Sequence, residues 1–413
     1  MRLRITAAAY ALWLAALLVA FYLAHGNDAT SLELVLMAGL VPTALQLILL
    51  GIDTHGLVAP VRYWFALVII IVLSYVANAF DPTMQPMNAT NLPISPAVTT
   101  LVYAFNVVLI LAIATIVAGS PERDLLREIA STYALLGAAF LLYVDVTGTM
   151  TWGRLTANDI TSNVWGLMGL NVCIAALARK IRPPGIAAFV IGLATILLAS
   201  SREHLLALAV ALLVAVVLWL RTAHVTSLVA ALIYACVGLF ATAFILDPYL
   251  INAVNYMGSN VLLLNSTSRG LNSGFTGRVD IWQATIDLWL RHPLFGVGFR
   301  QHELFLEGGL PSHNAYLAML ADTGIFGFIV YVWLLVRSTV ASWSIEEIRM
   351  RRFVVLMLTT YIIFGFFDRR TIDAGNTYSL FFVMACAVAL TQAALRQSLS
   401  ERMSRTSIAS ATT

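Results

Sequence analysis

The chain has 413 residues, of which 60% are apolar and only 11% are charged. Soluble globular domains are about 25% charged and less than about 50% apolar, so this composition excludes a cytosolic enzyme, a disordered chain and a nucleic-acid-binding protein. The mean hydropathy of +0.86 is typical of a membrane protein with several spans. The formal net charge is +3, and every basic residue except Lys180 is an arginine. The planar guanidinium suits phosphate, although a bias in codon use would produce the same excess.

Twelve segments of the chain are predicted to be membrane-spanning helices, because a span needs about 20 mostly apolar residues. They cover approximately residues 5–24, 31–51, 61–80, 98–118, 125–145, 160–178, 185–200, 204–220, 225–246, 313–336, 353–367 and 376–395. The seventh and the eleventh are short. The sequence therefore predicts an all-α polytopic membrane protein with about twelve transmembrane helices.

The distribution of basic residues predicts how these spans are oriented. With the N-terminus in the cytoplasm, sixteen basic residues fall in inside segments and eight in outside segments, as the positive-inside rule requires. The predicted organisation is nine spans in 1–246, an outside loop in 247–312, three spans in 313–396 and a cytoplasmic tail in 397–413. The outside arginines oppose the rule, which indicates a function for some of them: Arg154, Arg202, Arg269, Arg278, Arg291, Arg300, Arg369 and Arg370.

The long outside loop is expected to contain short helices, since structureless loops of this length are uncommon. Residues 278–291 are predicted to form one, and Pro293 ends it. The residues that recur at helical spacing are Ile281, Trp282, Thr285, Ile286 and Trp289. The two tryptophans fit either an interfacial helix at the lipid headgroups or a helix packed on the protein itself.

The loop ends at Pro311-Ser312-His313-Asn314, directly before an apolar helix. Ser312 is the expected N-cap, which would place His313 in the first turn of the tenth span. There the helix dipole and nearby arginines would lower the pKa of the imidazole and keep it neutral. Because a neutral imidazole can accept a proton from a hydroxyl, His313 is the predicted general base.

The residues that follow His313 form a recognisable pattern: His-Asn, nine residues, Gly324, two residues and Gly327. This pattern resembles that of the O-antigen ligase family, whose superfamily also contains the O-antigen polymerases. Other pieces match in the same order: Ser200-Ser201-Arg202, Gly277-Arg278 with Trp282 close behind, and His292-Pro293-Leu294-Phe295-Gly296-Val297-Gly298. The resemblance covers approximately residues 190–330.

The resemblance implies a glycosyltransferase of the multi-spanning GT-C type in the Gram-negative inner membrane. Members of the family transfer a completed O-antigen glycan from undecaprenyl diphosphate to a sugar hydroxyl of lipid A–core on the periplasmic side, and they invert the anomeric centre. They work without a metal ion or another cofactor, and the sequence has no Asp-x-Asp pair for a metal-bound nucleotide. The expected partners are the lipid-linked donor, lipid A–core and membrane lipids, with no nucleic acid.

In such a reaction side chains must stabilise the departing diphosphate, and arginine can contact phosphate oxygens in a bidentate manner. Arg202 and Arg278 match family positions and are predicted to be the catalytic arginines. Three further outside arginines are predicted to help bind the substrate: Arg154, Arg291 and Arg300.

His313 is predicted to remove the proton from the acceptor hydroxyl; the alternative is that it binds phosphate as an imidazolium. Its neighbour Asn314 is assigned to the substrate-binding set. Asp368, at the outer end of the eleventh span, is predicted to orient His313 or hold an arginine. A local pair with Arg369 or Arg370 is the more ordinary explanation for Asp368.

Two rival functions remain open. A polymerase of the same superfamily would share the arginines and the long loop, and the ligase is favoured only because the His-Asn pattern is closer to that branch. A transporter or flippase would place ionisable groups near the bilayer midplane, often in repeated halves. Here the span interiors are almost free of charge and no internal repeat is visible.

Overall fold

The computed structural model describes residues 1–23, 35–79, 96–151, 154–158, 160–179, 182–220, 278–306, 309, 311–369 and 377–411. The predicted ninth span, 225–246, lies outside these residues, as do Arg269 and Arg370. Every other predicted span overlaps a helix. The long helices are α1 (Arg2–Leu23), α3 (Leu40–Leu49), α4 (Val58–Ala79), α5 (Pro96–Ala118), α6 (Leu125–Thr147), α7 (Ser162–Leu177), α8 (Pro183–Leu198), α9 (Arg202–Leu220), α13 (Ala315–Ser342), α14 (Ile348–Phe364) and α15 (Thr377–Ala411).

Several helices in the described part of the chain have the length and apolarity of membrane spans. Five meet both criteria, over Arg2–Ala20, Val58–Asn78, Leu125–Thr147, Ala315–Ser342 and Ser379–Glu401. Shorter apolar helices cover Val35–Leu49, Ala104–Ala118, Ser162–Leu177 and Pro183–Leu198. The chain is therefore a helical membrane protein, while the number of twelve spans stays a prediction.

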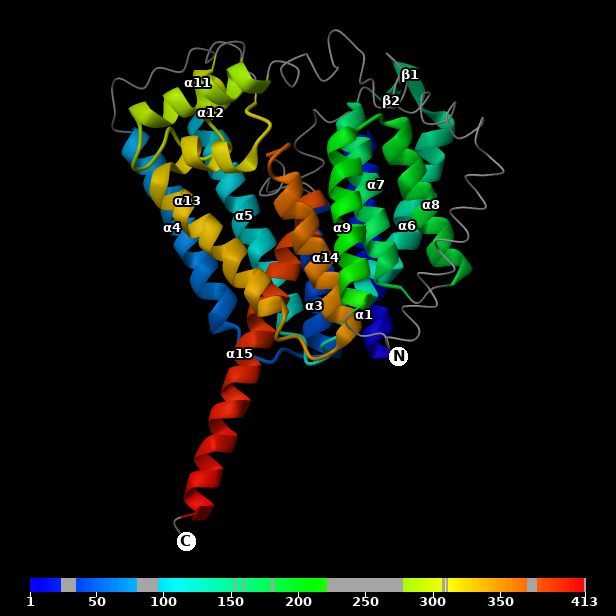
Figure 1. Ribbon diagram of the computed structural model, residues 1–413, viewed down its shortest axis with the longest axis vertical. Coiled ribbons are helices and arrows are strands. Elements are labelled where there is room, and N and C mark those ends of the chain that lie inside the picture. Colours follow the sequence, from blue (N-terminus) through cyan, green and yellow to red (C-terminus); the bar gives the residue numbers. More distant parts are fainter. Residues whose placement is uncertain are drawn as a thin grey trace.

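The connections between the helices are sorted to the two ends of the bundle (Figure 1). Helices α11 (Arg278–Arg291) and α12 (His302–Phe305) and the strands β1 (Thr149–Thr151) and β2 (Arg154–Thr156) lie at one end, here called the loop end. Both termini lie at the other, here called the terminal end. Helix α15 leaves the bundle there and continues to Ala411, so most of the predicted tail prolongs the last predicted span as helix.

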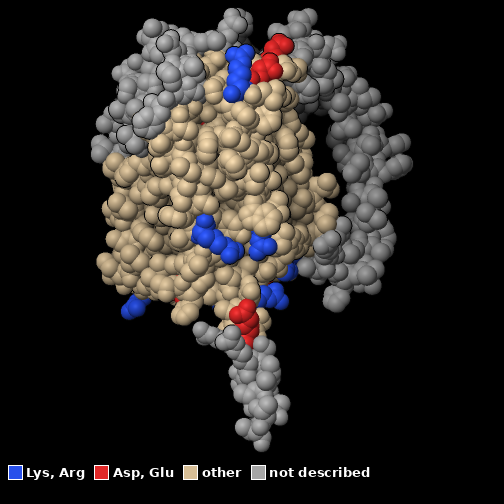
Figure 2. All heavy atoms as spheres, turned by 90° about the vertical axis from the view of Figure 1, so that its left-hand side faces the viewer, with Lys and Arg blue, Asp and Glu red and all other residues tan. Residues whose placement is uncertain are grey.

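Charged side chains of the described residues leave a broad middle band of the molecule uncovered on the face that Figure 2 shows. Arginine and acidic groups lie above this band and further arginines below it. Because a charge in the hydrocarbon core of a bilayer is costly, this distribution suits a protein that crosses a membrane between its two ends.

The strands β1 and β2 are the exception to an all-α fold in the described chain. They form an antiparallel pair in which Thr149 lies opposite Thr156 and Thr151 opposite Arg154. This small hairpin connects α6 to α7 at the loop end, and it places Arg154 beside the ends of neighbouring helices.

Helix α13 is interrupted at Gly324, whose φ of 66° and ψ of −168° are not helical. The break exposes backbone groups that would otherwise bond within the helix, and the preceding loop uses them. Val297 N donates to Ala321 O (2.9 Å), Gly298 N to Asp322 O (2.9 Å), and Ile325 N to Pro293 O (2.8 Å). Three backbone hydrogen bonds thus join the loop 293–298 to α13 at its break, in the manner of two paired strands.

Glycine is required on both sides of this contact. Gly296 and Gly324 both have φ of 66°, a region that favours glycine. A Cβ at Gly324 would overlap Leu294 O, and one at Gly296 would overlap Ala321 O. The glycines of the family pattern therefore have a structural reason: they let two backbones approach closely at the loop end.

Helix α4 also forms hydrogen bonds with the loop 293–298 and with α13 near its break. Ser74 Oγ lies 2.6 Å from Phe295 O and 2.7 Å from Asp322 O, within hydrogen-bond distance of both. Asn78 Nδ2 donates to Gly296 O at 3.1 Å. Three segments distant in sequence are therefore joined, which gives the loop before α13 a defined position.

Candidate active site

A largely buried ion pair joins α9 to α11 at the loop end. Arg278 Nη2 donates to Glu203 Oε2 at 2.8 Å, and the two side chains are only 18% and 9% exposed. Glu203 Oε1 is also buried, and it has no hydrogen-bond partner among the described residues. A buried carboxylate oxygen without a partner is costly, so this oxygen is suited to a group that a ligand supplies.

Further charges surround Glu203, which lies ahead of the predicted span 204–220. Burial raises the pKa of this carboxyl, and the Arg278 guanidinium opposes the rise; Asp368 raises it further and Arg154 lowers it. Arg154, Arg278 and Asp368 therefore lie close enough to act on one carboxylate, and Arg202 is its sequence neighbour at the start of α9. Three predicted site residues thus share one electrostatic environment.

Arg154 is held in place by the end of α8. Its Nε donates to Ala199 O (2.9 Å) and its Nη2 to Asn163 Oδ1 (2.5 Å). Ala199 is the C-cap of α8, and a cation there complements the negative end of the helix dipole. Arg154 therefore has a structural role in addition to its effect on Glu203.

The start of α13 differs from the prediction at His313. The N-cap is Asn314 and not Ser312: Asn314 Oδ1 accepts from Tyr316 N and Leu317 N, each at 3.0 Å. His313 therefore precedes the helix instead of lying in its first turn, and its φ is 49°. The predicted N-cap and the predicted first-turn position of His313 were wrong, because asparagine can cap a helix as well as serine.

Two hydrogen bonds join the backbone on either side of the half-buried His313 to segments that carry charged residues. Trp282 Nε1, one helical turn after Arg278, donates to Ser312 O at 2.8 Å. On the other side Ala315 N donates to Gly365 O at 2.8 Å, which joins the start of α13 to the segment that contains Asp368. The backbone around His313 is therefore bonded to both segments that carry charges around Glu203.

The face of helix α11 that contains Trp282 packs against the rest of the protein. Thr285 and Leu288 are buried, and Trp289 Nε1 donates to Pro293 O at 3.2 Å. Of the two explanations for the tryptophans, these contacts favour a helix packed on the protein itself. The predicted bounds of this helix, 278–291, are confirmed.

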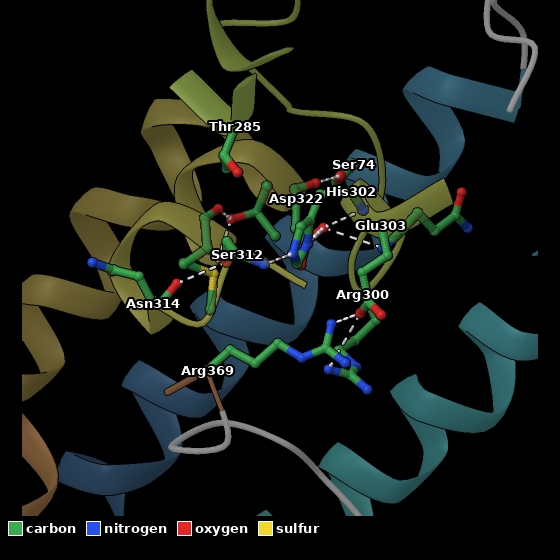
Figure 3. A network of polar contacts seen from close by, with 12 residues as sticks. Ser74, Thr285, Arg300, His302, Glu303, Ser312, Asn314, Asp322 and Arg369 are labelled. Atoms are coloured by element: carbon green, nitrogen blue, oxygen red, sulfur yellow. Dashed lines mark hydrogen bonds and ion pairs between the residues drawn. The ribbon is translucent and has the colours of Figure 1, made fainter. Parts of the chain in front are cut away.

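A second ion-pair group joins α12 to the segment after α14 (Figure 3). Glu303 forms a close ion pair with Arg369, and Arg300 Nη1 lies 3.9 Å from the same Glu303 oxygen. Phe299, Arg300, Met319 and Arg369 are among the residues that line a small cavity there. Arg369 thus pairs with Glu303, and the local pair of Asp368 with Arg369 or Arg370 stays a prediction.

His302 and Asp322 form a buried polar pair at the loop end (Figure 3). His302 Nδ1 lies 2.8 Å from Asp322 Oδ1, and the two side chains are 0% and 4% exposed. The same oxygen accepts from the backbone N of His302 (2.9 Å) and of Gln301 (3.1 Å). The pair therefore holds α12 against α13 just before the break at Gly324.

Arg291 is a predicted site residue that lies apart from the ion pairs at Glu203 and Glu303. It is exposed and ends α11, thirteen residues after Arg278, which is about 20 Å along a helix. The structure thus gathers Arg154, Arg278 and Asp368 around Glu203 and places Arg300 with Arg369 at Glu303. The backbone that contains His313 and Asn314 is bonded to the segments of Arg278 and Asp368.

Sequence reasoning missed the acidic members of both groups, Glu203 and Glu303, and the pair His302–Asp322. Each had a weak signal. Glu203 follows Arg202 directly, Glu303 stands three residues after Arg300, and Asp322 interrupts an apolar span. A carboxylate close in sequence to an outside arginine is therefore the signal that could have identified Glu203 and Glu303. In the residues that the structure describes, no three His, Cys, Asp or Glu side chains are grouped to hold a metal ion.

Fold and site together define a helical membrane protein with a cluster of arginines, carboxylates and histidine at one end. Residues 187–332 match the model of a family described as O-antigen ligase. The matched segment contains Arg202, Arg278 and His313, together with the broken helix around Gly324. The matched segment coincides with the part of the chain on which the sequence resemblance rests, so the resemblance is confirmed there. No curated protein matches the chain.

Proposed function

We propose that this protein is an O-antigen ligase of the bacterial inner membrane. It transfers the glycan from undecaprenyl diphosphate to a sugar hydroxyl of lipid A–core, and it works on the periplasmic side with both termini in the cytoplasm. The observation that carries the proposal is the loop-end group: Arg278 on Glu203 inside the matched domain, with Arg154 and Asp368 acting on the same carboxylate.

The arginines act on the departing diphosphate. The ion pair with Glu203 positions Arg278, and Arg202 precedes Glu203 directly at the start of α9. Preorganised cations aimed at developing negative charge lower the barrier more in a partly dry site than in water. Glu203 is here a positioning residue, because its contact is to the guanidinium.

His313 completes the transfer as the general base. The acceptor oxygen forms a bond to C1 of the glycan while the bond from C1 to the diphosphate oxygen breaks. The bonding electron pair leaves with the diphosphate, and the proton of the acceptor hydroxyl goes to the His313 ring. Attack from the face opposite the leaving group inverts C1. General-base assistance of this kind contributes roughly 10²–10⁴-fold.

Asn314 supports His313 through the backbone. By capping α13 with two hydrogen bonds, it fixes the point at which the loop becomes helix, and His313 is the residue just before that point. Asp368 lies on the segment bonded to the same helix start, and its proposed role is to orient the His313 ring or to hold an arginine.

The test uses the full chain in nanodiscs with undecaprenyl-diphosphate-linked glycan, with and without lipid A–core. Glycan should appear on lipid A–core only when both substrates are present, and His313→Ala should give none. Glycan that lengthens on the carrier lipid without lipid A–core would identify a polymerase instead. Movement of intact donor across the membrane without any transfer would identify a flippase.

A further inference from the structure

The terminal end of the molecule contains a hollow that the proposed reaction does not use. It has a volume of about 1520 Å³, part of it open to the outside, and it lies between α7, α8, α9 and α14. Its apolar lining includes Ile186, Phe189, Ala215 and Leu356. Ile186 and the neighbouring Val190 are more than half exposed on α8, so the apolar surface continues from the hollow onto the outside of the bundle.

Three arginines line the same hollow: Arg179 after α7, and Arg349 and Arg352 in the first turns of α14. Arg349 is exposed, whereas the other two are half-buried. Arg179 donates to Ser131 O, which fixes the direction of its side chain. The lining contains no acidic side chain from the described part of the chain. Three arginines and no acidic side chain among the described lining residues make this apolar hollow complementary to an anion with an apolar tail.

From this juxtaposition we infer a binding site for an anionic glycerophospholipid. Its phosphate would lie against the three guanidiniums, which match phosphate geometry, and its acyl chains would follow the apolar surface of α8. Basic pockets between membrane helices are known to hold anionic lipid headgroups on the cytoplasmic side. The predicted orientation places the terminal end on that side.

The position of the hollow separates this lipid from the substrate of the proposed reaction. Helix α8 begins at the hollow and ends at Ala199, whose carbonyl accepts from Arg154 in the loop-end group. Its 16 residues span about 24 Å. A headgroup among Arg179, Arg349 and Arg352 is therefore a helix length away from Arg278 and His313, and it does not compete with the donor diphosphate.

The test measures lipid binding to the purified full chain in a neutral detergent by native mass spectrometry. The probes are dioleoylphosphatidylglycerol and dioleoylphosphatidylethanolamine, which have the same chains but different charge. We expect the wild type to bind the anionic lipid about tenfold more tightly. Replacing Arg349→Gln together with Arg352→Gln should weaken that binding roughly 10- to 30-fold and leave the zwitterionic lipid unaffected.

The matched control removes two arginines of α4 and α13 that do not line the hollow, Arg62→Gln with Arg337→Gln. It should change binding of the anionic lipid less than about twofold. An equal loss in the control, or equal affinity for both lipids in the wild type, would overturn the inference.

Two further measurements cover the remaining outcomes. Should the double variant fail to fold, Arg349→Gln alone replaces only an exposed side chain, and it should weaken binding about three- to fivefold; no change would contradict the site. Undecaprenyl phosphate should not displace the anionic phospholipid. Displacement would assign the hollow to the carrier lipid instead.

Discussion

His302 and His313 lie in the same connection between α11 and α13, yet their surroundings are opposite. His302 is fully buried on Asp322, and its other ring nitrogen lies 3.5 Å from Ser312 N. His313 is half-buried, precedes the helix in a left-handed conformation, and lies beside charged segments. A histidine with both nitrogens bonded in the core stabilises the fold, whereas one at the edge of a charged group can exchange a proton with a substrate.

The largest effect is expected for His313→Ala, which should lower the rate of transfer roughly 10²–10⁴-fold because a general base is lost. The melting temperature in detergent should stay within a few degrees of the wild type. Transfer assays with purified protein and a thermal unfolding scan separate the two effects. Transfer near the wild-type rate would remove His313 from the mechanism.

The next largest effect on transfer is expected for Arg278, whose guanidinium is paired with Glu203. Arg278→Ala should reduce kcat/KM for the donor roughly 10- to 100-fold, since a charge-assisted contact is worth about 1.5–3 kcal/mol. Arg278→Lys should restore little, because an ammonium has no planar fork. Arg291→Ala on the same helix is the matched control and should behave as wild type. Equal losses in Arg278→Ala and Arg291→Ala would show that α11 matters only as a structural element.

The buried histidine should show the reverse pattern. His302→Ala leaves the Asp322 carboxylate without its side-chain partner in the core, at a cost of about 1–3 kcal/mol in the free energy of unfolding. The protein should therefore unfold at a lower temperature, and the fraction that remains folded should retain much of its rate. A variant with wild-type stability and no transfer would reverse the roles of the two histidines.

The last effect concerns the stability of the fold where the loop meets the broken helix. Gly324→Ala puts a side chain at a φ of 66° and its Cβ in overlap with Leu294 O, so the cost exceeds the roughly 1–3 kcal/mol of a strained φ alone. Gly51→Ala is the control, since Gly51 has a φ of 75° and nothing within 4 Å of an added Cβ. A melting temperature that falls more for Gly324→Ala than for Gly51→Ala would assign the excess to the contact with the loop.

Local patterns were sufficient for the parts of this fold that depend on one segment at a time. Helix α11 has its predicted bounds because the spacing of its apolar residues and Pro293 are both local features. The cap of α13 was misplaced by two residues, since Ser312 and Asn314 are both good caps. Which of them caps the helix depends on Trp282 and Gly365, which bond this backbone from other segments.

What the sequence by itself determined is the class of the protein and its resemblance to the O-antigen ligase family. Apolar stretches must form helices in a membrane because every backbone polar group needs an internal partner, and the His-Asn pattern with its spaced glycines indicated the ligase domain. Only the tertiary structure decided which charges meet. It paired Arg278 with Glu203 and Arg369 with Glu303, left Arg291 apart, and explained Gly324 by the loop that bonds to the broken helix. The reason is physical: an ion pair depends on distance in space, and residues far apart along the chain become neighbours only when the helices pack.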